Sequence, residues 1–112
     1  MSDLTTKPPP NYAPTYAAAM YPDLAELARQ HGYALAVHGS LARDLDLIAI
    51  PWVEDASEPQ QVLDAILAKF AVNLIGDVGR KPHGRIVYTL SVGWGHCAID
   101  LGFMPKRKGG EA

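Results

Sequence analysis

The chain has 112 residues, a formal net charge of −2 and 48% apolar residues. A chain of this length buries roughly two-thirds of its surface in one core, so we expect one domain that needs no disulfide. This composition excludes a disordered chain, and 10 Lys+Arg against 12 Asp+Glu argue against a protein that coats nucleic acid or binds a membrane surface through its charge. The one cysteine, Cys97, excludes an internal disulfide and a metal site built from cysteines.

The sequence contains neither a membrane span nor a signal peptide by its pattern. No apolar run approaches the roughly 20 residues that cross a bilayer, and the N-terminus lacks the apolar stretch that precedes a cleavage site. We therefore expect a cytoplasmic protein without membrane contact. A short chain of this kind suits a bacterium, a phage or a mobile element.

Two terminal segments differ in composition from the rest. Residues 1–15 contain four prolines among small polar residues and are expected to form a flexible Pro-rich arm. Residues 106–112 carry three cations and two glycines and are expected to form a basic tail. A single domain then spans 16–105, and its oligomeric state is left open.

In chain order, the first predicted element is a short amphipathic helix over 18–31. Pro22 suits the first turn of this helix, and Gly32 suits its end. Nearly continuous apolar runs at 33–38 and 45–50 are typical of buried strands.

A second helix is predicted to begin near Ser57, which forms a capping box with Gln60. A short strand near 72–75 is followed by a glycine-punctuated loop at 76–79, and 85–103 predicts a β-hairpin. The order of elements predicts an α+β fold. We expect one mixed sheet of about four to five strands with two main helices packed on one face.

The turn between the first two strands is the most informative segment. Gly39 and Ser40 end the first strand, where a backbone amide and a hydroxyl can donate to a phosphate oxygen. Asp44 and Asp46 open the next strand, and residues two apart on a strand point to one face, so both can chelate one cation. Asp100 lies in an otherwise apolar strand, and three carboxylates would converge on two divalent ions if that strand lies beside Asp46.

This pattern resembles the nucleotidyltransferase superfamily, in particular its minimal single-domain members. Their order is a strand, Gly-Ser, a connecting segment, Asp-x-Asp on the next strand and a later strand Asp, and the resemblance covers about residues 18–104. It implies a nucleotidyltransferase-like fold and transfer of a nucleotidyl group from a nucleoside triphosphate to an unknown acceptor. That acceptor is a protein hydroxyl, an RNA 3′ end or a small molecule.

The resemblance also implies roles for particular residues. The metal-binding and catalytic carboxylates, with Mg²⁺ or Mn²⁺, are Asp44, Asp46 and Asp100. The nucleotide-phosphate contacts are Gly39, Ser40 and, from the family's Gly-Ser-x-x-Arg pattern, Arg43.

The connection between Gly-Ser and Asp-x-Asp departs from the family. Only residues 41–43 intervene, which span roughly 10 Å, so there is little room for a triphosphate. This favours an alternative, a catalytically degenerate binding module, antitoxin- or inhibitor-like, that acts through a protein partner. In a third interpretation the domain is unrelated, Asp44 caps a turn and Asp46 pairs with Arg43 or Arg85.

Other residues have competing interpretations. The basic loop 80–85 is either a solvated loop or a contact for a triphosphate or an RNA backbone, and Arg85 is its best-placed cation. We favour His38 as a core histidine over a general base or phosphate donor. Trp52 and Trp94 flank turns and either cover the core or stack on a base.

Overall fold

The computed structural model describes residues 10–93 and 97–106 and contains a single five-stranded sheet within them. Its elements are, in chain order, α2 (Ala13–Gln30), β1 (Tyr33–His38), β2 (Leu45–Pro51), α3 (Pro59–Lys69), β3 (Asn73–Arg80), the 3₁₀ turn η1 (Pro82–Gly84), β4 (Ile86–Ser91) and β5 (Ala98–Phe103). The strand order is β1-β2-β5-β4-β3. Strands β2 and β5 are parallel and the other neighbours are antiparallel, so the sheet is mixed.

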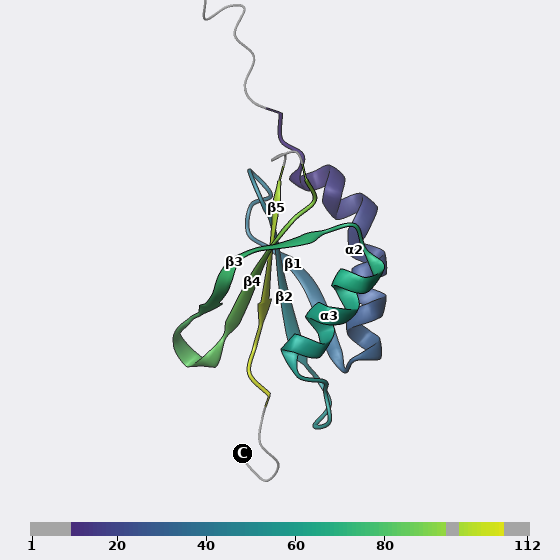
Figure 1. Ribbon diagram of the computed structural model, residues 1–112, viewed down its shortest axis with the longest axis vertical. Helices are drawn as coiled ribbons and strands as arrows, with labels where there is room; N and C mark the ends of the chain where they lie inside the picture. Colours follow the sequence, from purple (N-terminus) through teal and green to yellow (C-terminus); the bar gives the residue numbers. More distant parts are fainter. Residues whose placement is uncertain (1–9, 94–96, 107–112) are drawn as a thin grey trace, which may run out of the picture.

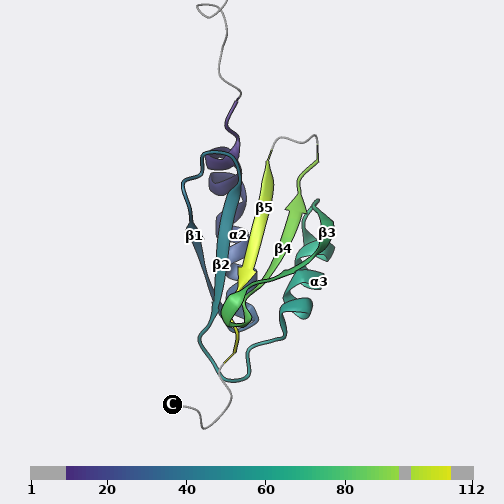
Figure 2. The ribbon, with the colours of Figure 1, turned by 90° about the vertical axis from the view of Figure 1, so that its left-hand side faces the viewer.

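Both α2 and α3 lie on one face of this sheet, and within the described residues no helix covers the other face, called the open face below (Figures 1 and 2). The predicted α+β fold with one mixed sheet and two helices is therefore confirmed. Successive side chains along a strand point to opposite sides of the sheet, so buried and more exposed residues alternate along β2 and along β5 up to Leu101. Asp46 and Asp100 are only half-buried, whereas their immediate neighbours along β2 and β5 are buried in the core.

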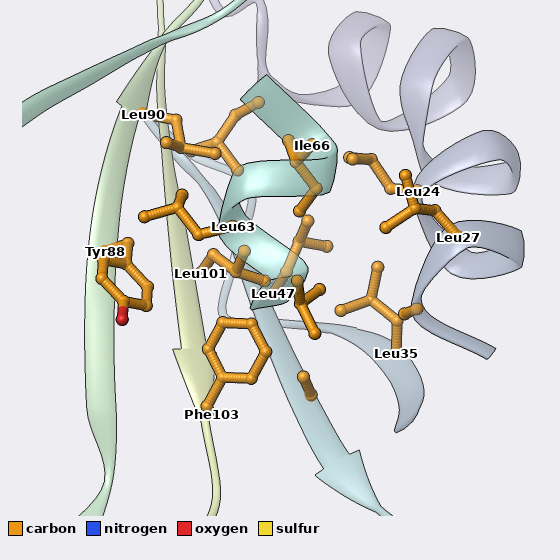
Figure 3. Packing of buried hydrophobic residues seen from close by; sticks show 14 of the residues in the cluster. Leu24, Leu27, Leu35, Leu47, Leu63, Ile66, Tyr88, Leu90, Leu101 and Phe103 are labelled. Carbon is orange, nitrogen blue, oxygen red and sulfur yellow. The ribbon is translucent and has the colours of Figure 1, made fainter. Parts of the chain in front are cut away.

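The core lies between the sheet and the helices. Its largest fully buried side chains come from the strands and from α3: Tyr33, Phe103, Leu45, Leu47, Leu63, Leu90, Ile99 and Val62. The Phe103 ring lies edge-on to Tyr33 at 5.3 Å and to Tyr88 at 5.9 Å between ring centroids. Figure 3 shows Phe103, Leu101 and Leu47 pointing from the sheet toward α3 and α2. Such edge-to-face ring pairs add to the burial of apolar surface.

The first helix is longer than predicted. It begins at Ala13 rather than at 18, so Pro22 lies inside it and Pro14 occupies its first turn. Ala13 is fully buried, and Leu24 and Leu27 pack into the same core. Tertiary packing therefore stabilises a helix that the internal Pro22 would otherwise disfavour.

The second helix and the following strand also differ in detail. The helix α3 is capped by Glu58 and Gln61 rather than by Ser57 and Gln60, because the Ser57 hydroxyl is hydrogen-bonded to His31 Nδ1 at 2.9 Å. The predicted loop at 76–79 is wrong, since it belongs to β3, whose register shifts between Ile75 and Gly79. Such a shift is typical of a β-bulge, which bends a strand.

The hairpin of β4 and β5 is confirmed, with Thr89 opposite Asp100. Its turn, with Trp94, and most of both predicted terminal segments (1–9 and 107–112) lie outside the described residues. Lys106, assigned to the tail, contacts the domain, because its Nζ donates to the Ala56 carbonyl at 3.0 Å. Within 10–93 and 97–106, no helix is long and apolar enough to cross a membrane.

Candidate functional site

Four polar residues form a row across the open face of the sheet. Asp46 on β2 lies directly opposite Asp100 on the parallel strand β5. His38 on β1 lies opposite Asp46, and Thr89 on β4 lies opposite Asp100. Because neighbouring strands are about 4.8 Å apart, this register places the four side chains beside one another in the order His38, Asp46, Asp100, Thr89.

The two carboxyl groups at the centre of this row interact with each other. Burial raises the pKa of Asp46, and a hydrogen bond with Asp100 and the charge of Asp100 raise it further, while His38 acts in the opposite direction. The Thr89 hydroxyl donates to Asp100 Oδ1 at 3.1 Å and holds that carboxyl group in place. A pair of adjacent carboxylates must share a proton or bind a cation, because the two negative charges repel.

The turn that joins β1 to β2 is closed by its own hydrogen bonds. Ser40 Oγ accepts from the Ala42 amide at 3.2 Å, and the Leu41 carbonyl accepts from Asn11 Nδ2 at 2.6 Å. Leu41 has φ +58°, a left-handed conformation that leucine rarely adopts. Asp44 Oδ1 accepts from the Ala98 amide at 3.3 Å, which links the end of the turn to the start of β5.

A pocket of about 320 Å³ lies over the carboxyl pair. Asp46 and Asp100 form part of its floor, and the β3–β4 hairpin supplies Asp77, Lys81 and Arg85 to its lining. Figures 1 and 2 show the end of this hairpin leaving the plane of the sheet on the side away from the helices. The pocket thus has two acidic groups beneath it, and two cations and a third acidic group, Asp77, at its side.

The structure brings some of the predicted site residues together and leaves others apart. Asp46, Asp100 and Arg85 share the pocket, whereas Ser40 and Arg43 do not line it. In the described ranges, 10–93 and 97–106, no group of three or more His, Cys, Asp or Glu residues is arranged to hold a metal ion. Binding of a metal by all three predicted carboxylates therefore stays a prediction, although the adjacent pair offers the oxygen donors that Mg²⁺ prefers.

The structure changes the interpretation of two residues of the pocket, His38 and Lys81, and adds Thr89 to it. His38 is exposed and lines the pocket, so its interpretation as a core histidine is wrong. Thr89 was not considered for this site, and Lys81 was considered only as part of the basic loop 80–85; the register of β4 with β5 and the path of the hairpin bring them to the pocket. Trp52, with 63% of its surface exposed, follows the far end of β2 from Asp46 and is not part of this pocket.

Comparison with known proteins identifies the fold. No protein-family model matches the chain, and no curated protein matches it. Among solved structures, the chain is similar to that of a cytoplasmic RNA terminal U-transferase, with a TM-score of 0.58 and 16% sequence identity. The similarity covers 84% of this chain and 30% of that chain.

The fold is nucleotidyltransferase-like. At this low identity, the similarity concerns the fold alone, and the chain spans less than a third of the length of that structure. The chemistry of the carboxyl pair on β2 and β5 therefore depends on the geometry of this chain.

Proposed function

We propose that the chain is a minimal metal-dependent nucleotidyltransferase-like domain. It would bind a nucleoside triphosphate and move its nucleotidyl group to a hydroxyl of an acceptor. The observation that supports this proposal is the placement of Asp46 directly opposite Asp100 on parallel neighbouring strands, beneath a pocket with two cations. The nucleotidyltransferase-like fold supports the same conclusion.

In such a transfer, the acceptor hydroxyl oxygen forms a bond to the α-phosphorus. The bond from that phosphorus to the oxygen that bridges to the β-phosphate breaks, so pyrophosphate leaves and the hydroxyl proton is released. A divalent ion, Mg²⁺ or Mn²⁺, held by Asp46 and Asp100 would neutralise phosphate charge and act as a Lewis acid. His38 lies exposed beside Asp46, where its ring can accept the hydroxyl proton.

The similar solved structure guides the choice of acceptor. The similar solved structure is that of an RNA terminal U-transferase, which favours an RNA 3′ end as acceptor and UTP as the first triphosphate to test. The exposed face beside His38 leaves room for such a strand, because in the described part of the chain both helices lie behind the sheet (Figure 2).

A calorimetric titration tests the proposal. Mg²⁺ or Mn²⁺ is titrated with and without a nucleoside triphosphate into the wild type, into Asp46→Asn and into Asp55→Asn. Asp55 is an exposed acid outside the pocket, so its variant controls for the loss of one charge. We expect metal-dependent nucleotide binding in the wild type and in Asp55→Asn, and its loss in Asp46→Asn. Transfer of labelled UMP to a short RNA then tests the chemistry.

A second candidate function is a catalytically degenerate binding module that acts through a protein partner. It is favoured by the hydrogen-bonded turn at Ser40, which holds the phosphate-contact residues of the family away from the pocket. Absence of metal-dependent nucleotide binding in the wild type would favour this function over the first. Retained nucleotide binding without transfer to any acceptor would also favour it.

A further inference from the structure

We propose that the polyphosphate of the substrate binds to Lys81 and Arg85 of the β3–β4 hairpin rather than to the Gly39–Ser40 turn. The inference rests on the proposed function, because it assigns the phosphate subsite of the same pocket. The resemblance places phosphate contacts at the Gly-Ser turn, so the inference departs from it.

The Gly-Ser turn lies outside the pocket, since neither Gly39 nor Ser40 lines it. The Ala42 amide of this turn already donates to Ser40 Oγ, and the turn has only three residues before Asp44. On the side of Gly39 where a Cβ would lie, the space is filled by Asp46 Oδ2, only 2.6 Å from that position. A carboxylate oxygen so close to the Gly39 backbone repels an anion at this place.

The hairpin, in contrast, presents two cations to the pocket from the two sides of its η1 turn. The Lys81 amide donates to the Arg85 carbonyl at 2.8 Å, so the two residues face each other at the end of the hairpin. Both residues line the pocket. The β-bulge between Ile75 and Gly79 bends β3, and the hairpin end projects over the open face (Figure 1).

The Arg85 side chain extends over β5 at Gly102. A Cβ on residue 102 would lie 3.6 Å from Arg85 Nη1, and Gly102 follows Asp100 by two residues on the same face of β5. The guanidinium therefore lies in the pocket near Gly102, two residues along β5 from Asp100. A planar guanidinium with several N–H donors is well suited to phosphate oxygens.

The acidic and basic groups of the pocket do not neutralise each other directly. The ion pairs found among the described residues join Arg29 to Glu26 and Lys106 to Glu58, and neither Lys81 nor Arg85 takes part in one. A ligand that carries both a divalent cation and several phosphates would pair with the carboxylates and with the two cations at once. The volume of about 320 Å³ is at the lower end of small-molecule sites, which start at about 300 Å³, and suits a metal-bound polyphosphate.

Calorimetry with two probes, tripolyphosphate and UTP, each with Mg²⁺, tests the inference. The hairpin variants are Lys81→Gln and Arg85→Gln, with Arg85→Lys as a milder change in case the first one disturbs folding. The turn variants are Ser40→Ala and Arg43→Gln. Lys69→Gln, on the exposed surface of α3, controls for loss of one positive charge, and circular dichroism checks that each variant is folded.

We expect Lys81→Gln and Arg85→Gln each to weaken binding of both probes by about tenfold or more, as is typical for loss of a charged hydrogen bond. The turn variants and Lys69→Gln should bind as the wild type does. The inference is overturned if the turn variants lose affinity while the hairpin variants keep it, or if Lys69→Gln loses as much as Lys81→Gln.

The two probes separate this inference from the proposed function. Binding of UTP that is indifferent to Lys81 and Arg85 would overturn the inference and leave the function standing. Hairpin-dependent binding of tripolyphosphate without any binding of UTP would overturn the function and leave the anion subsite standing. If the wild type binds neither probe, both are overturned.

Discussion

Gly39 lies against the carboxyl group of Asp46, so closely that a Cβ on residue 39 would be 2.6 Å from Asp46 Oδ2. The glycine also has φ +80°, in the left-handed region that other residues rarely adopt. The absence of a side chain at residue 39 therefore leaves the space that the Asp46 carboxyl group occupies. The role of Gly39 is steric, because it depends on the missing Cβ. Ser40 and Arg43 do not line the pocket.

Gly39→Ala is expected to reduce binding of Mg²⁺ because the new methyl group displaces the Asp46 carboxylate. Gly93→Ala is the matched control, since Gly93 has φ +90° and nothing within 4 Å of a Cβ. Both variants should lose about 1–2 kcal/mol of stability from the left-handed backbone. Calorimetry should show weaker metal binding only in Gly39→Ala, and equal binding in the two variants would contradict the steric role.

Thr89→Val is expected to weaken Mg²⁺ binding about tenfold, because it removes the hydroxyl that orients Asp100 while keeping the shape of the side chain. Thr89→Ser keeps the hydroxyl and should bind Mg²⁺ nearly as the wild type does. The two variants are compared by calorimetric titration with Mg²⁺. Equal loss in both would mean that packing at position 89, rather than the hydrogen bond, matters.

The metal-free protein should become less stable as the pH rises above about 4, because of Asp46. The pKa of Asp46 is raised by burial and by Asp100 above its ordinary value of 3.8. The contribution of the protonated Asp46 carboxyl group to stability is therefore complete below its unfolded-state pKa. This contribution is lost as the pH rises through the higher folded-state pKa. Thermal unfolding with EDTA between pH 3.5 and 8 should show a smaller decline in Asp46→Asn. A decline of the same size in both proteins would exclude Asp46 as its source.

Tyr33 should make the fold sensitive to alkali. Burial, followed by the charge of Glu58, raises the pKa of Tyr33 from 10.0 to about 12. The contribution of the neutral Tyr33 side chain to stability is complete below pH 10. It is lost as the pH rises toward 12, because ionisation of Tyr33 then favours the unfolded chain. Tyr33→Phe removes the hydrogen bond to the Ser57 carbonyl at a cost of about 1 kcal/mol at neutral pH.

Denaturant unfolding between pH 8 and 12 measures this alkaline effect. The loss of stability in this interval should be smaller in Tyr33→Phe than in the wild type. Parallel curves for the two proteins would show that other groups cause the alkaline unfolding.

Phe103→Ala is expected to lower the free energy of unfolding by about 3–5 kcal/mol, because Phe103 is 1% exposed and fills the space between Tyr33 and Tyr88. Trp52→Ala removes a ring that is 63% exposed and should change stability far less. Urea unfolding of the two variants checks this contrast. Similar losses in both would indicate that the core is not centred on Phe103.

Local sequence patterns were sufficient for the elements that depend on alternation and turns. The apolar runs of β1 and β2 and the hairpin of β4 and β5 were predicted within two residues of their observed ends. The start of α2 was not, because Pro14 was assigned to the Pro-rich arm and Pro22 to the first turn of the helix, whereas Pro14 occupies that turn. The burial of Ala13 in the core, a contact that no local pattern contains, favours the longer helix.

For the site, the pattern of residues along the chain indicates that Asp46 and Asp100 each lie in an apolar strand and need a partner. That they are each other's partner follows from the parallel pairing of β2 with β5 and from its register, which no local pattern contains. No local pattern places Lys81 in the pocket either, because the bend of β3 brings it there. Alternation along a strand sets which face a residue occupies, while pairing between strands distant in sequence decides which residues meet there.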